Sequence, residues 1–288
     1  MSFFSSLFGS PRLNYRQRFE LLQEARTGTM SQVFKARDKK TGELAALKIL
    51  DTKKIRAVEA RWKGAGKPSE GEIAVLFGHP YIVKTSEHGT TTDGDKYLIM
   101  EYLEGTGLDN ILAKQQDFLA GSRLYYVRQV AEAIQEVHTK GFIHRDICPR
   151  NLIFSGDAET LKLTDFGLTI PNRSPFTEPG NRTGTANYMA PELVRRKPTD
   201  IRLDVFSFGV TLYEMFTKEL PWLRGDTGNA AMTHSEPPEP ITTYRPQINP
   251  IIAKAIHSCI EPDVTKRCPN MTQFLKMISK AETEDDNS

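Results

Sequence analysis

The sequence is poor in the residues that mark several classes of protein. It has only 3 cysteines among 288 residues, Cys148, Cys259 and Cys268, and no Cys-x-x-Cys pair. Neither a zinc site nor a disulfide framework is supported, and a reducing, cytoplasmic compartment is the simpler interpretation. No apolar run approaches the length of about 20 residues that a membrane-spanning helix needs. The opening residues lack the basic segment of a signal peptide.

Charge of one sign is not in excess either. The 38 Lys and Arg residues and the 36 Asp and Glu residues leave a formal net charge of +2. This balance gives no reason to expect nucleic acid or a membrane surface as a partner, and it leaves the oligomeric state open. Apolar residues make up 39% and charged residues 26% of the chain, which is typical of a globular protein with a sizeable core.

The pattern of the first hundred residues predicts short strands separated by turns. Strands are predicted at residues 19–22, 32–36, 44–50 and 97–100. The sequence Asp-Lys-Lys-Thr-Gly at 38–42 predicts a hairpin turn between the second and the third. One helix is expected over residues 70–77, after a loop over 62–68.

Beyond residue 105 the pattern becomes helical. Apolar residues recur at steps of three and four over 122–138, which predicts an amphipathic helix. Residues 203–216 are apolar nearly all round, which predicts a buried helix. A third helix is expected over 271–278, with Asn270 as its N-cap. We therefore divide the chain into a flexible extension, a sheet-rich lobe, a helical lobe and an acidic tail that frays, at 1–15, 16–103, 104–280 and 281–288. A ligand cleft is expected where the lobes join.

Two short motifs in the helical lobe carry the chemistry. Residues 144–151 read His-Arg-Asp-Ile-Cys-Pro-Arg-Asn, and residues 165–167 read Asp-Phe-Gly after an apolar strand. Their order and spacing resemble the protein-kinase signatures H-R-D-x-x-x-x-N and D-F-G. Four more elements follow the family order, namely Ala-Leu-Lys at 46–48, Ala-Pro-Glu at 190–192, Asp-Val-Phe-Ser-Phe-Gly at 204–209, and Arg267.

This resemblance extends over roughly residues 19–279. It implies an α+β, protein-kinase-like two-lobed fold, with a small antiparallel β lobe and a larger, mostly helical lobe. It also implies a site for ATP and Mg²⁺, in which Lys48 contacts the α- and β-phosphates. A glutamate of the upper-lobe helix would fix this lysine. We favour Glu72, because Val75 and Leu76 would then face the cleft, and Glu70 is the alternative.

The remaining site residues follow from the same resemblance. Asp146 is expected to accept the proton of the substrate hydroxyl or to orient it. Asn151 and Asp165 offer hard oxygen ligands for Mg²⁺. The adenine ring would contact the backbone after Met100 and lie between apolar side chains, so that the expected binding residues are Glu101, Leu103, Val33, Ala46 and Ile153.

The phosphate-binding loop departs from the family pattern G-x-G-x-x-G-x-V. Counting back from Val33, the three glycine positions hold Arg26, Gly28 and Ser31, so only Gly28 survives. Glycine at these places lets backbone N–H groups approach phosphate closely. We therefore expect a weaker or altered affinity for the nucleotide.

The second departure is Cys148, which stands where Ser/Thr kinases usually carry a lysine that neutralises the γ-phosphoryl group. A thiol cannot supply that charge, whereas Arg150 resembles an arginine of the tyrosine-kinase loop that partly substitutes for it. Pro149 and the pair Gly184-Thr185 resemble the Ser/Thr class, which we favour. A reactive role for the cysteine is disfavoured, because nearby carboxylates raise the pKa of a thiol.

Arg145 resembles the arginine of kinases whose activation segment is ordered by phosphorylation. Thr177, Thr183 and Ser174 are the candidate sites, and the alternative is that these hydroxyls only form turns. The sequence thus predicts an ATP-dependent kinase for Ser/Thr hydroxyls of protein substrates, with an activity that is low rather than absent. The alternative is a weak or inactive pseudokinase that acts as a nucleotide-binding scaffold. A small-molecule kinase is disfavoured, because residues 184–192 resemble a platform that docks a peptide.

Overall fold

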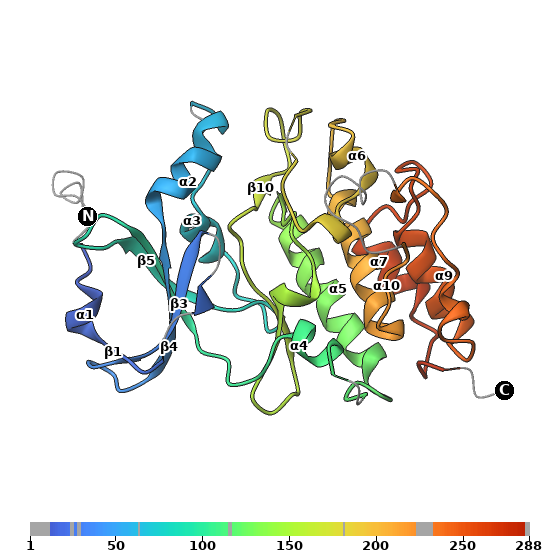
Figure 1. Cartoon of the computed structure of the whole chain (residues 1–288), viewed down its shortest axis with the longest axis horizontal. Helices are drawn as coiled ribbons and strands as arrows, with labels where there is room; N and C mark the ends of the chain where they lie inside the picture. The colour runs from blue at the N-terminus through green and yellow to red at the C-terminus, as the bar shows by residue number, and fades with distance from the viewer. Residues whose placement is uncertain are drawn as a thin grey trace. The chain divides into compact units, whose positions relative to one another are not determined.

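The computed structural model describes residues 12–23, 26–27, 30–62, 64–114, 117–180, 182–222 and 233–285. The chain forms two compact units. Unit 1 comprises Met1–Gly78 and Val83–Leu103, and unit 2 comprises His79–Ile82 and Glu104–Ser288. Figure 1 shows a twisted sheet in the first unit and a helical assembly in the second.

Unit 1 is built on one antiparallel sheet, whose strands follow the order β1-β3-β4-β6-β5, with β2 paired to β3. The predicted strand over 44–50 is confirmed as β4, and the predicted turn joins it to β3 with Gly42 at φ +78°. That positive φ is the reason for glycine at this place. The strands are β1 (Phe19–Leu21), β2 (Arg26–Thr27), β3 (Ser31–Asp38), β4 (Leu44–Leu50), β5 (Thr85–Thr90) and β6 (Lys96–Glu101).

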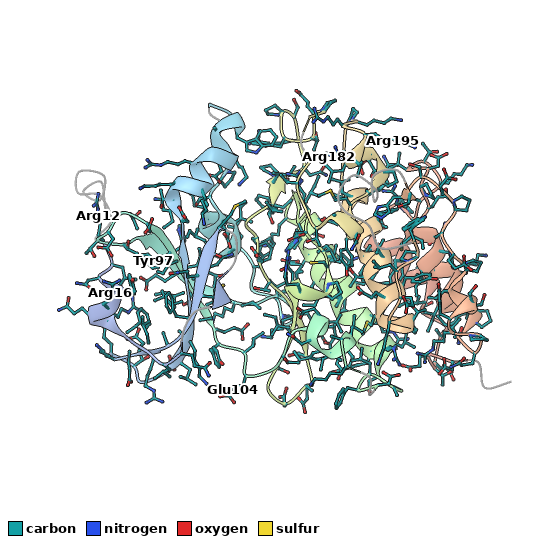
Figure 2. All side chains as sticks on the ribbon, in the orientation of Figure 1. Arg12, Arg16, Tyr97, Glu104, Arg182 and Arg195 are labelled. Carbon is teal, nitrogen blue, oxygen red and sulfur yellow. The ribbon has the colours of Figure 1, made fainter. Side chains whose placement is uncertain are left out.

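One face of this sheet carries the hydrophobic core of the unit. The buried members of the core are Phe19, Ala36, Ala45, Leu47, Tyr97 and Ile99. Tyr97 is labelled in Figure 2 among the side chains of the sheet. Since side chains alternate along a strand, the neighbours of these residues point to the opposite face, where the chemistry described below is found.

The N-terminal residues that the structure describes pack onto the core. Leu13 and Tyr15 lie against it, and the backbone N–H of Leu13 donates to the carbonyl of Thr90 at 3.0 Å. Arg12 and Arg16, labelled in Figure 2, remain exposed. Residues 12–15 therefore belong to the packing of unit 1, because Leu13 and Tyr15 are half-buried against the sheet while Arg12 and Asn14 are exposed.

Helices of unit 1 connect β4 to β5. They are α2 (Thr52–Glu59), the 3₁₀ turn η1 (Ala60–Trp62) and α3 (Glu70–Ala74), and α1 (Tyr15–Arg18) precedes the sheet. We did not predict α2, although Asp51 caps it by accepting from the backbone N–H groups of Lys53 and Lys54, both at 3.1 Å. The helix expected over 70–77 ends already at Ala74, and its start was predicted correctly.

Unit 2 is assembled around α7 (Arg202–Thr217), which is buried along nearly its whole length as predicted. It packs on α5 (Arg123–Thr139) and α9 (Pro250–Cys259), and Figure 1 shows these helices together. The expected cap Asn270 accepts from Gln273 at 2.9 Å and starts α10. The other elements are α4 (Leu108–Leu112), α6 (Pro191–Val194), α10 (Met271–Met277), β7 (Phe142–Ile143), β8 (Leu152–Phe154), β9 (Leu161–Leu163), β10 (Ile170–Pro171), η2 (Pro149–Asn151), η3 (Ala186–Tyr188) and η4 (Ile241–Thr243).

The acidic tail does not fray over the residues that are described. Glu284 is 7% exposed and accepts from Arg123 at 2.8 Å and from Arg245 at 2.9 Å. Asp285 accepts twice more from Arg245, at 2.7 and 2.8 Å. The prediction of a frayed tail is wrong here, because buried arginines of distant segments need these carboxylates as partners.

Candidate active site

A buried ion pair stands on the sheet of unit 1. Lys48 lies on β4, and its Nζ is 2.6 Å from Oε1 of Glu70, the first residue of α3. The two side chains are only 7% and 8% exposed. The carboxylate holds the ammonium group in place inside the unit. Burying either charge without its partner would carry a large free-energy cost of desolvation.

The preference for Glu72 as the partner of Lys48 is therefore wrong, and the alternative Glu70 is correct. The two glutamates are two positions apart on α3, which is about 200° around a helix, so both cannot face the same strand. Glu72 is exposed and turns back to Ser69, whose backbone N–H donates to its Oε2 at 2.8 Å. Hydrogen bonds from the backbone and the hydroxyl of Ser69 lower the pKa of Glu72.

The predicted adenine-binding residues of unit 1 share one face of the sheet. Val33 is the register partner of Lys48, and Ala46 is the partner of Met100. These positions alternate with the core residues on β3, β4 and β6, so their side chains point away from the core. Val33, Ala46 and Met100 are half-buried, which leaves apolar surface for a planar ring.

The other predicted binding residues are placed as follows. The backbone N–H of Glu101 donates to the carbonyl of Lys84 at 2.9 Å, and Leu103 ends unit 1 half-buried. Ile153 belongs to unit 2, where it pairs with Lys162 across β8 and β9. Gly28 lies outside the described residues.

Unit 2 holds the carboxylate of Asp146 in a dense network. Its Oδ2 accepts from the amide of Asn151 at 2.9 Å and faces the guanidinium of Arg150 at 3.3 Å. Its Oδ1 accepts from Thr185, from the backbone N–H at 3.0 Å and from the hydroxyl at 2.6 Å. Thr185 is a site residue that sequence reasoning missed, although the Gly-Thr pair was read there as a marker of kinase class.

The backbone before Asp146 is fixed by a second carboxylate. Asp204 is fully buried, and its two oxygens accept from the N–H groups of His144 and Arg145, both at 2.7 Å. His138 also bonds to Asp204 at 2.9 Å. The backbone of Arg145 has φ +72°, which residues other than glycine rarely adopt, and the two hydrogen bonds to Asp204 hold this conformation. The ring of His144 packs edge-on against Phe166 at 5.1 Å, so His144 is a packing residue as expected.

Asn151 and Asp165 present the oxygens that a divalent cation prefers. The amide nitrogen of Asn151 donates to the backbone carbonyl of Asp146 at 2.8 Å and to its Oδ2 at 2.9 Å, so the amide oxygen is not used in these bonds. Asp165 is exposed at φ +67°, and its Oδ1 accepts from Gly167 at 3.2 Å. No cluster of three or more His, Cys, Asp or Glu side chains suited to a metal occurs among the described residues.

Comparison with known proteins decides the family. The family model of the protein kinase domain matches residues 19–278. The chain belongs to the protein kinase family. Its antiparallel sheet and its helical unit are the two lobes of the kinase fold, so the predicted fold class is confirmed.

Relatives of this kinase domain are found in bacteria and in animals. A protein named "probable serine/threonine-protein kinase" from Clostridium acetobutylicum is 29% identical over 91% of this chain and 39% of its own length. One with the same name from Clostridium perfringens is 32% identical over 91% of the chain and 38% of its length. Human ribosomal protein S6 kinase alpha-6 is 33% identical over 75% of the chain and 28% of its length. The chain thus spans about two fifths or less of these relatives.

The thiol of Cys148, in the catalytic loop, is buried and lies beside a carboxylate. Cys148 is 1% exposed. Burial, with the charge of Asp146, raises the pKa of Cys148 to about 12. A protonated, buried thiol is a poor nucleophile, which agrees with the reasoning against a reactive role. The guanidinium of Arg150 lies 3.3 Å from Asp146 and also donates to the hydroxyl of Thr185 at 3.0 Å.

The activation segment of this kinase contacts the catalytic loop. The guanidinium of Arg145 donates to the hydroxyl of Thr183 at 2.8 Å, whereas Ser174 donates to Glu178 at 2.6 Å. Thr183 is thus the candidate hydroxyl that already lies beside an arginine. Gly184, with φ +140°, approaches the carbonyl of Arg145, and a Cβ there would come within 2.9 Å of that oxygen.

Two further family elements are paired as expected. Arg267 binds Glu192 through two nitrogens, at 2.7 and 2.9 Å. The guanidinium of Arg267 also lies 4.9 Å from the ring centre of Phe206, the residue that stands where the family usually has tryptophan. Both side chains of the ion pair are buried, so the pair anchors the segment that follows the activation loop.

No helix within the described ranges has the length and apolarity that a membrane span requires.

Proposed function

We propose that this protein kinase transfers the γ-phosphoryl group of Mg-ATP to Ser or Thr hydroxyls of protein substrates. The observation that carries the proposal is the Asp146 carboxylate, which Asn151 and Thr185 hold at 2.9 and 2.6 Å. A carboxylate oriented in this way is suited to receive the proton of an incoming hydroxyl.

The chemistry requires little from the protein beyond position and charge. The substrate hydroxyl oxygen bonds to the γ-phosphorus while the bond from that phosphorus to the bridging oxygen of ADP breaks. Asp146 orients the hydroxyl and takes its proton. Lys48, fixed by Glu70, binds the α- and β-phosphates, and we assign the adenine ring to the face of the sheet that carries Val33, Ala46 and Met100.

The divalent ion belongs with Asn151 and Asp165. When bound, Mg²⁺ neutralises charge on the β- and γ-phosphates, which is where charge builds up during the transfer. The donation of the Asn151 amide nitrogen to Asp146 links the metal ligand to the base, because it fixes the plane of the amide.

Arg150 supplies the cation that the kinase loop otherwise lacks. Its guanidinium lies 3.3 Å from Asp146 on a side chain that is 63% exposed, so it has room to turn toward a phosphoryl group. Removing one charge-stabilising donor from an active site typically costs about 10²–10³ in rate. An exposed arginine restores only part of the lost rate, because water screens its charge. We therefore infer that the rate of phosphate transfer is lower than in a kinase with the usual lysine.

Ser/Thr specificity is supported by the loop residues and by the relatives. Pro149 and Thr185 match the Ser/Thr pattern, and the hydroxyl of Thr185 bonds to Asp146. The relatives reported above carry Ser/Thr kinase or ribosomal protein S6 kinase names.

A second candidate function is a pseudokinase scaffold that binds nucleotide without transferring phosphate. The absent lysine at Cys148 favours it, as do Arg26 and Ser31 at glycine positions of the phosphate loop. The intact set of Lys48, Asp146 and Asp165 argues for the active enzyme.

The two candidates are separated by one assay. The wild type and Asp146→Asn are incubated with Mg-ATP labelled at the γ-phosphate and a generic protein substrate, and phosphoamino acids are then analysed. The active enzyme predicts label on Ser and Thr for the wild type and a loss of at least about 10²-fold for the variant. Equal label from both proteins, or label on tyrosine alone, would contradict the proposal.

A further inference from the structure

The helix that carries Glu70 is too short to hold this residue by itself. It has five residues, Glu70–Ala74, and Glu70 is the first of them. No helical turn precedes Glu70, so no hydrogen bond within the helix fixes its backbone from the N-terminal side. Isolated helices of this length are unstable in water, which means that other contacts must determine where Glu70 lies.

A capping box supplies the missing contacts. Oε2 of Glu72 accepts from the backbone N–H of Ser69 at 2.8 Å and from the hydroxyl of Ser69 at 2.7 Å. The hydroxyl in turn accepts from the backbone N–H of Glu72 at 3.4 Å. The carbonyl of Ser69 accepts from Ile73 at 3.1 Å. Ser69 is therefore tied to the helix at three of its own groups, and Glu70 is the next residue.

The rest of the helix is seated on β5. Gly71 approaches His88 so closely that a Cβ on the glycine would come within 2.5 Å of the histidine Cβ. Ile73 is fully buried, whereas Val75 and Leu76 are 39% and 49% exposed. The body of the helix is thus fixed by packing, and the capping box adds hydrogen bonds at its first turn.

The segment before the cap gives little further support. Gly64 and Gly66 adopt φ +85° and +67°, and a Cβ on either one would meet nothing within 4 Å. An ion pair of Lys67 with Glu59 at 3.1 Å is the contact that ties this segment back to α2. Between Lys67 and Glu70, the capping box of Ser69 and Glu72 supplies side-chain hydrogen bonds that hold the backbone.

We propose that Glu72 is a positioning residue for nucleotide binding, which acts through Ser69 to hold Glu70 against Lys48. The inference rests on the proposed function, because Lys48 is taken to bind the phosphates. Glu72 itself touches neither Lys48 nor the nucleotide. Its carboxylate closes the cap, the cap fixes the first helical residue, and that residue fixes the ammonium group.

Two measurements test this chain of contacts. The first is the affinity for Mg-ATP, measured by titration. The second is the rate at which the amine of Lys48 is acetylated by a brief treatment with acetic anhydride, measured by peptide mass spectrometry in the absence of nucleotide. Glu72→Ala should weaken nucleotide binding about fivefold and speed the acetylation of Lys48 by a similar factor, which is the usual effect of losing a helix cap.

The controls separate position from general stability. Glu72→Gln keeps an oxygen acceptor for the box and should behave like the wild type in both measurements. Glu43→Ala removes an exposed glutamate elsewhere in unit 1 and should change neither. If Glu72→Ala proves unfolded at the assay temperature, Ser69→Ala replaces it, since this change removes the hydroxyl and leaves the carboxylate.

A double variant gives the decisive comparison. In a Glu70→Gln background, Glu72→Ala should weaken Mg-ATP binding no further, because the group that it positions is already gone. The inference would be overturned if Glu72→Ala weakened Mg-ATP binding by the same factor in the Glu70→Gln background as in the wild type. It would also be overturned if Glu72→Ala matched the wild type in both measurements. If the wild type transfers no phosphate, but Glu72→Ala still speeds the acetylation of Lys48, the proposed enzyme is refuted and the positioning role of Glu72 remains.

Discussion

The catalytic loop of unit 2 and the Lys48–Glu70 pair of unit 1 are held in different ways. The loop is fixed by Asp204, which lies 59 and 60 positions away from the backbone groups that it binds. The ion pair depends on α3, whose first residue is fixed by a capping box that spans three positions. Contacts across the whole unit break only when that unit opens, whereas a local cap can open by itself.

This difference assigns separate tasks to the two regions. In unit 2, the carboxylate of Asp146 is fixed in orientation, because its two oxygens accept four hydrogen bonds from Asn151, Thr185 and Arg150. In unit 1, the residue that pairs with Lys48 stands next to a local cap, and we propose that this pair positions the nucleotide. The following predictions are ordered by the size of the expected effect.

The largest effect is expected for Asp204→Ala. It leaves the N–H groups of His144 and Arg145 without their buried acceptor, which should lower the free energy of unfolding by about 3–5 kcal/mol and abolish phosphate transfer. Chemical denaturation and the labelled-ATP assay measure the two consequences. A stable variant that is still active would mean that the loop is not anchored by this carboxylate.

The acid dependence of stability provides a control for that variant. Burial alone would raise the pKa of Asp204, but hydrogen bonds from His138 and from the backbone of Arg145 lower it overall. A lowered pKa contributes stability above the unfolded value of about 4, and this contribution is lost as the pH falls through the folded value. The advantage of the wild type over Asp204→Asn should therefore shrink below about pH 4. An advantage that stays constant there would contradict the assignment.

The next effect is expected for Glu70→Gln. The variant removes the charge that fixes Lys48, so kcat/KM for Mg-ATP should fall about 10²-fold while the fold of unit 2 persists. Steady-state kinetics at varied ATP checks this. Glu72→Gln is the matched control on the same helix, and an equal loss from both changes would mean that the helix as a whole matters and the pair does not.

A smaller effect is expected for Arg150→Ala. The exposed guanidinium should contribute about tenfold to kcat and little to the KM for ATP, because it acts on the transferred group. Kinetics of Arg150→Lys should recover part of the loss. An unchanged kcat in Arg150→Ala would show that another cation compensates for Cys148.

The smallest effect is expected for Cys148→Ser. The thiol of Cys148 is buried and protonated, so its replacement should change kcat by less than about twofold. The native protein should also resist alkylation at Cys148 by iodoacetamide at neutral pH, as peptide mass spectrometry would show. Rapid alkylation together with a loss of activity would restore a reactive role for this cysteine.

Local signals in the sequence were enough for much of this structure. The β4 strand, the buried helix α7 and the cap at Asn270 follow from composition and spacing over a few residues. The motifs around Asp146 and Asp165 were recognisable because the chemistry requires those residue types in that order.

Other features depend on contacts that spacing does not encode. Periodicity did not decide between Glu70 and Glu72, because the choice depends on which glutamate hydrogen-bonds to Ser69 at the helix cap. The tail looked free because its partners, Arg123 and Arg245, lie 161 and 39 positions before Glu284. Helix α2 was missed because four of its eight residues are charged, so that its apolar residues are few.

The central claim of the proposed function is that binding of Mg-ATP depends on both Lys48 and Asp165. Titration calorimetry with ATP, in Mg²⁺ and then in EDTA, tests it most directly with Lys48→Met and Asp165→Asn beside the wild type. The account predicts tighter binding in Mg²⁺ for the wild type, weaker binding in both conditions for Lys48→Met, and no gain from Mg²⁺ for Asp165→Asn. A wild type that binds equally well in EDTA, or an Asp165→Asn protein that keeps the full gain from Mg²⁺, would contradict it.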